Sequence, residues 1–228
     1  MMWSYSKIKD FFQCPRMYQE KRVLKTFKYI ESPEAARGTR LHAAFEHYVK
    51  DGTPIPPEFE RHKHFVESLA SAEGIKLTEY QMACDANRAS VPYYDPTKAE
   101  PKGWEFNPAA FIGGVADLII IDERDTATYV DYKTGKGQYP DKDQCELMSM
   151  LLMQEFPHLR KVDTALLFVD ANKIVEKSYF ADDLDAIWGR WMEKIARIET
   201  ASKTDVWQQK PSGLCKYCQA RTCPNWSE

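Results

Sequence analysis

The 228-residue sequence has no apolar run that approaches the roughly 20 residues needed for a membrane-spanning helix. Its first residues, Met1 to Tyr5, lack the charged segment followed by an apolar stretch that marks a secretory signal. Internal repeats and low-complexity segments are also absent. We therefore expect a cytoplasmic protein that contacts no membrane and has one main domain.

An excess of positive charge is missing as well. The formal net charge is -3, which argues against a protein that coats nucleic acid by bulk attraction. A local basic stretch is nevertheless present, because residues 7 to 28 contain seven Lys and Arg against two acids, with aromatic residues between them. Two interpretations stay open for this stretch, a solvated amphipathic helix or a surface that contacts phosphates.

Six cysteines in a chain expected to stay in a reducing compartment are thiols or metal ligands rather than disulfides. Three of them, Cys215, Cys218 and Cys223, lie close together in the tail. Metal clusters use such a spacing, whereas hydrophobic cores rarely require it. A fourth ligand would have to come from elsewhere in the chain.

Hydrophobic periodicity predicts an α/β fold with a central mixed β-sheet flanked by helices. Two apolar, partly β-branched runs separated by a charged turn predict a hairpin at 111–121 and 127–133. The expected helices cover about 4–13, 35–50, 58–73, 141–156 and 182–200. Further strands are expected within 75–105 and at about 162–170 and 173–180.

The hairpin carries the residues that indicate a chemistry. Side chains alternate along a strand, so Asp131 and Lys133 share one face while Tyr132 points away, and Asp117 can reach the same place from the partner strand. Two neighbouring carboxylates in an apolar sheet repel unless a cation lies between them, and oxygen ligands suit Mg²⁺ or Mn²⁺. The alternative is an ordinary cross-strand salt bridge on a surface hairpin, which the apolar flanks disfavour.

A histidine far upstream is a further candidate. His42 follows Gly38 on a predicted helix and shares one face of it with Glu46. A lone histidine on a helix is more often structural than a ligand, so His42 gains meaning only from the rest of the pattern.

Together, these motifs resemble the RecB-like exonuclease branch of the PD-(D/E)XK nuclease superfamily, which includes CRISPR-adaptation nucleases and small phage exonucleases. The resemblance covers nearly the whole chain. It rests on Ser4 to Ile8, Cys14-Pro15-Arg16-x-Tyr18, Gly38-x-x-x-His42, Gly114-x-x-Asp117 and Asp131-x-Lys133. It implies a single nuclease domain over residues 1–228 with a restriction-endonuclease-like core.

The resemblance also implies roles for individual residues. His42, Asp117, Asp131 and the backbone carbonyl of Tyr132 would bind Mg²⁺ or Mn²⁺. The catalytic groups would be Asp117, Asp131, Lys133 and Gln144. Gln144 matches the first position of a Q-x-x-x-Y motif that contacts substrate, but Met148 stands where the tyrosine is expected.

For the cysteines, the resemblance implies a [4Fe-4S] cluster bound by Cys14, Cys215, Cys218 and Cys223. The cluster would staple residues 206–228 to residues 1–30 and so pack the tail on the N-terminal helices. A Cys₄ zinc site and free thiols remain alternatives.

The sequence therefore predicts a metal-dependent DNA exonuclease that hydrolyses phosphodiester bonds and acts on DNA with a free end. The alternative is a non-catalytic DNA-binding or recombination-adaptor protein on the same fold. The similarity to phage enzymes also predicts a viral origin and action in a host cytoplasm. Strand preference, polarity and protein partners are not written in these motifs.

Overall fold

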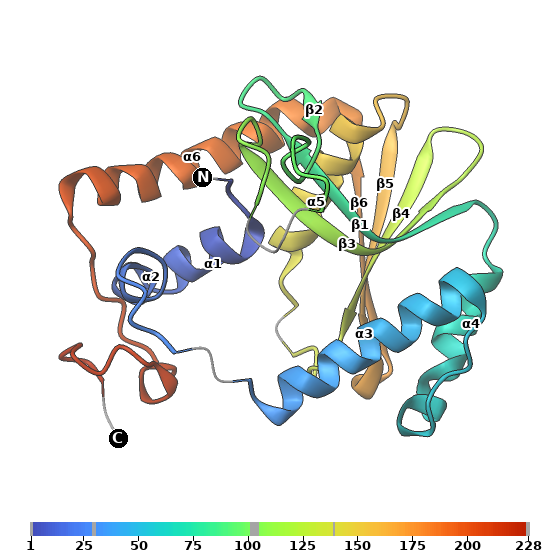
Figure 1. The fold of residues 1–228 in the computed structure, drawn as a ribbon, viewed down its shortest axis with the longest axis horizontal. Coiled ribbons are helices and arrows are strands. Elements are labelled where there is room, and N and C mark those ends of the chain that lie inside the picture. Colours follow the sequence, from blue (N-terminus) through green and yellow to red (C-terminus); the bar gives the residue numbers. More distant parts are fainter. Residues whose placement is uncertain (1, 29–30, 101–104, 139, 227–228) are drawn as a thin grey trace. The chain divides into compact units, whose positions relative to one another are not determined.

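The computed structural model describes residues 2–28, 31–100, 105–138 and 140–226 (Figure 1). The chain forms two compact units. The large unit comprises Met1–Met2 and Glu31–Ile187, and the small unit comprises Trp3–Ile30 and Trp188–Glu228. No helix in the described part of the chain is both long and apolar enough to cross a membrane.

The large unit is built on one six-stranded sheet with the order β2-β1-β3-β4-β5-β6 (Figure 1). Its strands are β1 (Ile75–Cys84), β2 (Ser90–Val91), β3 (Ile112–Ile121), β4 (Thr126–Lys133), β5 (Lys161–Phe168) and β6 (Lys173–Phe180). Strands β4 and β5 pair in parallel, and the other neighbours pair antiparallel. The sheet is therefore mixed, which confirms the expected architecture.

Helices α3 (Pro33–Asp51) and α4 (Lys63–Ser71), with the 3₁₀ helix η2 (Pro57–His62) between them, cover one face of the sheet (Figure 1). Their apolar side chains form one core cluster with alternate residues of β3 and β4. Phe45 of α3 packs edge-on against Tyr132 of β4, with 5.0 Å between ring centres. This packing places α3 beside the end of β4, where the candidate metal ligands lie.

Helix α5 (Lys142–Glu155) connects β4 to β5, as a parallel pair requires. Eight of its residues are buried, including Cys145 and every residue from Leu147 to Met153. A helix buried almost all round belongs to the core. It packs closely on β3, because a Cβ added at Gly114 would lie 2.6 Å from Sδ of Met148.

One charged cluster ties the end of β5 to the helical layer. Asp170, in the 3₁₀ turn η3 (Val169–Ala171), accepts two hydrogen bonds from Arg37 at 2.7 and 3.0 Å and one from Arg61 at 2.8 Å. Nε2 of the buried His62 lies 3.1 Å from the same carboxylate. Burial raises the pKa of Asp170, but Arg37 and then Arg61 outweigh it and lower the pKa below its ordinary value.

Asp170→Asn is expected to lower the free energy of unfolding by about 1–3 kcal/mol at pH 7, because two guanidinium groups lose their counter-charge. A carboxyl whose folded pKa is depressed stabilises the protein above its unfolded pKa, and this contribution is lost as pH falls through the folded value. Urea unfolding at neutral pH and near pH 3 should therefore show a difference that shrinks in acid. Glu58→Gln is the control, because its ion pair with Arg40 is exposed and should contribute little to stability.

The small unit contains α1 (Tyr5–Gln13), α2 (Pro15–Tyr18), the π helix η1 (Gln19–Val23) and the 3₁₀ helix η5 (Cys215–Tyr217). Helix α6 (Leu184–Thr204) begins in the large unit and ends in the small one. Past α6, the ring of Trp207 stacks on Tyr18 at 5.8 Å, and Nζ of Lys210 donates to the carbonyl of Phe12 at 2.8 Å. The tail thus packs on the N-terminal helices, as expected from the sequence.

The expected subdomain of residues 1–30 and 206–228 falls almost wholly within the small unit, which also takes in the end of α6. Residues 1, 29–30 and 227–228 of that prediction lie outside the described residues.

Candidate metal centre

The candidate site begins where β3 and β4 separate. Their pairing runs from Ile121 and Ala127 to Leu118 and Val130, and it stops there. Asp117 is the next residue of β3, and its Oδ2 accepts a hydrogen bond of 2.7 Å from the backbone N–H of Tyr132. A carboxylate therefore satisfies the amide that the ladder leaves unpaired, and this bond fixes the orientation of Asp117.

His42 approaches this end of the hairpin from α3. Its Nε2 lies 2.9 Å from the backbone carbonyl oxygen of Tyr132, and its Nδ1 lies 3.3 Å from Oδ1 of Asp117. Burial lowers the pKa of His42, but the hydrogen bond and charge of Asp117, followed by the charge of Asp131, outweigh burial and raise it. A raised imidazole pKa means that the neighbouring carboxylates favour a positive charge at this position.

Glu79 completes the group from β1. One ligand atom each of His42, Glu79 and Asp117 can be chosen so that all three lie within 4.8 Å of one another. Glu79 has a φ of 46°, a left-handed conformation that is uncommon outside glycine. The ladder between β1 and β3 pairs the residues on either side but omits Glu79 and Asp117. The local distortion thus coincides with the acid that joins the site, as is common at functional positions.

Sequence reasoning did not identify Glu79, because a single acid in a mixed strand belongs to no recognisable spacing. The feature that could have identified Glu79 is the register of β1 with β3, in which Thr78 pairs with Leu118 and Tyr80 with Ala116. This register sets Glu79 opposite Asp117, but it is visible only once β1 and β3 are known to be neighbours.

The carboxylates of the site are costly to ionise together. Burial, followed by the charges of Asp117 and Glu46, raises the pKa of Glu79. Burial and then Asp117 raise the pKa of Asp131, although Lys133 opposes them. A divalent cation relieves this repulsion, and two carboxylates, a carbonyl oxygen and an imidazole are donors that Mg²⁺ or Mn²⁺ accepts. The residues present therefore fit such an ion.

Asp131 and Lys133 face α5. Nζ of Lys133 lies 2.6 Å from Oδ2 of Asp131 and donates to Oε1 of Gln144 at 3.0 Å. Nε2 of Gln144 donates in turn to Oδ1 of Asp131 at 2.7 Å, and Tyr129 donates to the same oxygen at 3.2 Å. Asp131 is only 3% exposed, and the bonds from Gln144 and Tyr129 satisfy its Oδ1. Its Oδ2 is paired with the Lys133 ammonium but accepts no hydrogen bond from the described residues. Gln144 thus positions both charged groups.

The structure brings the sequence-predicted residues together with one difference in grouping. His42, Asp117 and the Tyr132 carbonyl converge, and Lys133 and Gln144 converge on Asp131. The third side chain of the tight triad around His42 is Glu79 rather than Asp131. Asp131 still acts on this triad through its charge, since it raises the pKa of His42.

Met148 replaces the expected tyrosine of the Q-x-x-x-Y pattern, and its surroundings are those of a core residue. It is 3% exposed, and it lies against Gly114 of β3. At this position the chain therefore presents a buried apolar side chain, and Gln144 has no tyrosine partner one turn along the helix.

The four predicted cluster cysteines share one cavity of about 530 Å³ in the small unit. Cys14, Cys215, Cys218 and Cys223 all line it, and each is partly exposed. Within the described residues, no three of their sulfur atoms come within 4.8 Å of one another. A single zinc ion with Zn–S bonds of about 2.3 Å draws four thiolates closer than that. A four-iron cube spaces its thiolates more widely.

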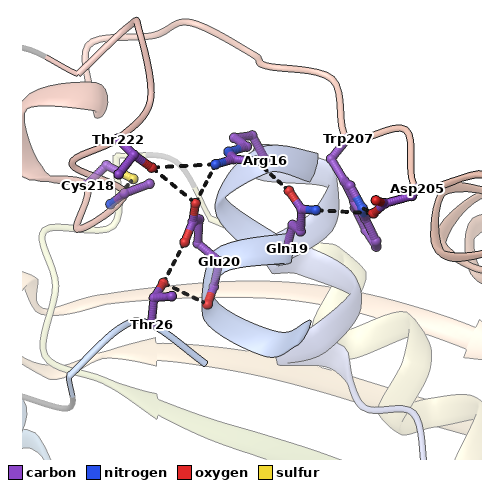
Figure 2. Close-up of polar contacts among 9 residues, drawn as sticks. Arg16, Gln19, Glu20, Thr26, Asp205, Trp207, Cys218 and Thr222 are labelled. Atoms are coloured by element: carbon purple, nitrogen blue, oxygen red, sulfur yellow. Dashed lines mark hydrogen bonds and ion pairs between the residues drawn. The ribbon is translucent and has the colours of Figure 1, made fainter. Parts of the chain in front are cut away.

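A polar network beside this cavity joins the tail to the N-terminal helices (Figure 2). The buried carboxylate of Glu20 accepts from Arg16 at 2.6 Å, from Oγ1 of Thr26 at 2.6 Å and from Oγ1 of Thr222 at 3.4 Å. Gln19 accepts from Arg16 at 2.7 Å and donates to Asp205 at 3.3 Å. Protein groups alone therefore connect the segments that carry the cysteines.

Two solved structures, SSO0001 and a protein from Eubacterium rectale, have the same fold at low sequence identity. The crystal structure of SSO0001 matches with a TM-score of 0.50 at 15% identity, over 100% of this chain and 88% of that one. A protein from Eubacterium rectale described as a candidate exonuclease matches with a TM-score of 0.54 at 13% identity, over 96% and 87%. A structure of LHK-Exo in complex with dAMP matches with a TM-score of 0.37 at 15% identity, over 90% and 93%.

Among curated proteins, none matches this chain. The family model of the PD-(D/E)XK nuclease superfamily matches residues 2–224. That match spans almost the entire sequence, including both units and every candidate site residue. The chain therefore belongs to the PD-(D/E)XK nuclease superfamily.

Proposed function

We propose that this protein is a Mg²⁺- or Mn²⁺-dependent DNA exonuclease. Membership of the nuclease superfamily supports hydrolysis of nucleic acid with a divalent metal ion. The observation that carries the proposal is the approach of His42, Glu79 and Asp117 to within 4.8 Å, beside the pair formed by Asp131 and Lys133. Two carboxylates, a histidine and a lysine in one place are the groups that phosphodiester hydrolysis by activated water requires.

The residues divide into two sets by what they contact. His42, Asp117, Glu79 and the Tyr132 carbonyl would bind the ion, with Asp131 adding charge from the α5 side. When bound, a divalent ion polarises a phosphate oxygen and lowers the pKa of water.

Lys133 supplies the positive charge that can stabilise a developing oxyanion, and it can donate or accept a proton at Nζ. Gln144 keeps Nζ in place from α5, because its Oε1 accepts from Lys133 while its Nε2 is bonded to Asp131. Tyr129 adds a second fixed donor to Asp131. This arrangement leaves Lys133, which is 34% exposed at its side chain, as the group of the pair that substrate can reach.

End-labelled linear DNA incubated with Mn²⁺, with EDTA as the control, tests the activity. Shortened products that require the metal support the nuclease. DNA that binds the protein but stays intact supports the alternative, a non-catalytic recombination adaptor on the same fold. Covalently closed circular DNA then tests for exonuclease action, because an exonuclease should leave the circle intact. Linear strands blocked at either end show from which end the enzyme degrades DNA.

We further propose that Cys14, Cys215, Cys218 and Cys223 bind a [4Fe-4S] cluster with a structural role. The shared cavity supports this assignment, together with the close spacing of three of the cysteines in the tail. A cluster there would add covalent links between the tail and Cys14, which directly precedes α2. Glu20 and Gln19 of η1 already join this part of the chain to Thr222 and Asp205 by hydrogen bonds. The expected viral origin stays a prediction.

Protein purified without air is expected to contain about four irons and four sulfides per chain. Cys218→Ser should lose most of this iron, whereas Cys84→Ser, at a buried thiol of the large unit, should keep it. Iron and zinc content by mass spectrometry of the metals, together with the visible absorption spectrum, measures the effect. A colourless protein with one zinc per chain would exclude the cluster.

A further inference from the structure

The two units differ sharply in charge. The small unit, Trp3–Ile30 with Trp188–Glu228, contains 14 Lys and Arg against 6 Asp and Glu, a formal charge of +8. Because the whole chain carries -3, the large unit carries -11. A unit with this excess of acids repels a polyanion, whereas a unit of +8 attracts one. The unit that contains the candidate metal centre is therefore poorly suited to collect DNA by itself.

The cavity of the small unit concentrates this positive charge. Among the residues that the structure describes, no aspartate or glutamate lines it, and five cations do, namely Arg16, Lys21, Arg22, Lys28 and Lys210. The first three form ion pairs with Glu20 or Asp10, whose carboxylates lie outside the lining. Lys28 and Lys210 are exposed and have no carboxylate partner within the described part of the chain. They are the cations that a phosphate can reach.

Aromatic side chains stand beside these cations. Tyr217 lines the cavity yet is 74% exposed, and Nζ of Lys216 lies 5.0 Å from its ring centre. Trp226 also lines the cavity, with the guanidinium of Arg221 at 4.4 Å over its ring. An aromatic ring that solvent can reach, next to lysines and arginines, is what proteins use to stack unpaired bases while they contact the strand's phosphates.

The walls that present these groups are fixed by the network of Figure 2. Glu20 is 5% exposed and binds three separate segments through Arg16, Thr26 and Thr222. The backbone N–H of Lys28 donates to Gln219 at 3.1 Å, which ties the N-terminal segment directly to the tail. A binding surface held in this way loses little conformational freedom when a ligand binds.

We propose that the rim of this cavity binds single-stranded DNA, with Lys28 and Lys210 contacting phosphates and Tyr217 stacking on a base. The inference deepens the proposed function, on which it rests for the identity of the nucleic acid. It assigns DNA affinity to the small unit and cleavage to the large one. We call Lys28, Lys210 and Tyr217 the rim, because these lining residues are exposed whereas the four cysteines are only partly exposed. The rim can therefore contact DNA whether or not the thiols bind a cluster.

Binding is measured by fluorescence anisotropy of labelled oligo(dT) in EDTA, on a Lys133→Met background that cannot cleave. The double variant Lys28→Glu/Lys210→Glu should bind at least about tenfold more weakly at low salt, and its log Kd should depend less steeply on log[salt], by about 1.4. Tyr217→Ala should weaken binding about fivefold or more with the salt slope unchanged. The control Lys50→Glu/Lys177→Glu makes the same change in net charge at exposed lysines of the large unit.

Thermal unfolding shows whether charge reversal disturbs the fold. If it does, the milder variant Lys28→Gln/Lys210→Gln replaces the double glutamate variant in the binding experiment. If these variants bound oligo(dT) with the parental affinity and salt slope, the proposal would be overturned. It would also be overturned if the parental protein did not bind oligo(dT) but bound an acidic protein instead. Hydrolysis of bis(p-nitrophenyl) phosphate with Mn²⁺ tests the metal centre alone. Its rate should be the same in the rim variants as in the parental protein. Parental protein that binds oligo(dT) at the rim but hydrolyses neither substrate would refute the nuclease and leave the rim assignment standing.

Discussion

Lys133→Met is expected to lower the rate of Mn²⁺-dependent DNA hydrolysis by about 10²- to 10⁴-fold. Nζ of Lys133 touches both Asp131 and Gln144, at 2.6 and 3.0 Å. Methionine fills a similar volume but carries neither charge nor proton. Initial rates on end-labelled DNA at saturating metal measure the loss, and anisotropy should show DNA affinity close to the parental value.

Lys161→Met is the matched control for this prediction. Lys161 pairs with Asp163 at the far end of β5, where both side chains are more than one third exposed. The register of β4 with β5 sets Lys161 beside Thr126, whereas Lys133 lies beside Phe168. Its loss should leave hydrolysis near the parental rate. Equal rates for Lys133→Met and the parental protein would remove Lys133 from the reaction.

Asp117→Asn is expected to abolish the stabilisation of the protein by Mn²⁺ and to reduce hydrolysis at least about 100-fold. A ligand at 100 times its Kd contributes about 2.7 kcal/mol, which for a chain of this size raises Tm by roughly 5–10 °C. Asparagine can still accept the hydrogen bond from Tyr132, so the hairpin should keep its shape. Differential scanning calorimetry with Mn²⁺ and with EDTA measures the effect.

The sign of the change without metal is informative. Burial, followed by the negative charge of Asp117, raises the pKa values of Glu79 and Asp131 in the folded protein. In EDTA, Asp117→Asn should therefore unfold at the same temperature as the parental protein or higher. Glu79→Gln should show a smaller loss of Mn²⁺ stabilisation, and Asp182→Asn, an exposed acid outside the site, should show none. A parental Mn²⁺ response in Asp117→Asn would mean that the ion binds elsewhere.

The sequence was informative about the hairpin because its signals are local. Alternation along β4 correctly separates Asp131 and Lys133, which face α5, from Tyr132, which packs on Phe45 of α3. Strand pairing then had to bring Asp117 close, and it did so in an unexpected way. The pairing of β3 with β4 ends at Leu118, which is next to Asp117. The backbone N–H of Tyr132 is thereby left unpaired and donates a hydrogen bond to the Asp117 carboxylate.

The family motifs extended this prediction to His42 and Gln144, which lie far from the hairpin in the sequence. His42 lies at the Tyr132 carbonyl, with which it was expected to share a metal ion, whereas the bond of Gln144 to Lys133 was not expected from its motif. Their roles in binding metal and in catalysis stay predictions. The missing tyrosine at Met148 was visible in the sequence, but only the packing against Gly114 shows that the position belongs to the core.

By itself, the sequence determined the α/β class, the hairpin and its alternating faces, because each of these depends on neighbours within one element. Tertiary structure alone decided that Glu79 joins His42 and Asp117, and that the four cysteines and the exposed cations line one cavity. Such groupings depend on which strands become neighbours and on where the chain returns after long connections. No local periodicity records that choice, because it is made by the packing of the whole sheet and its helices.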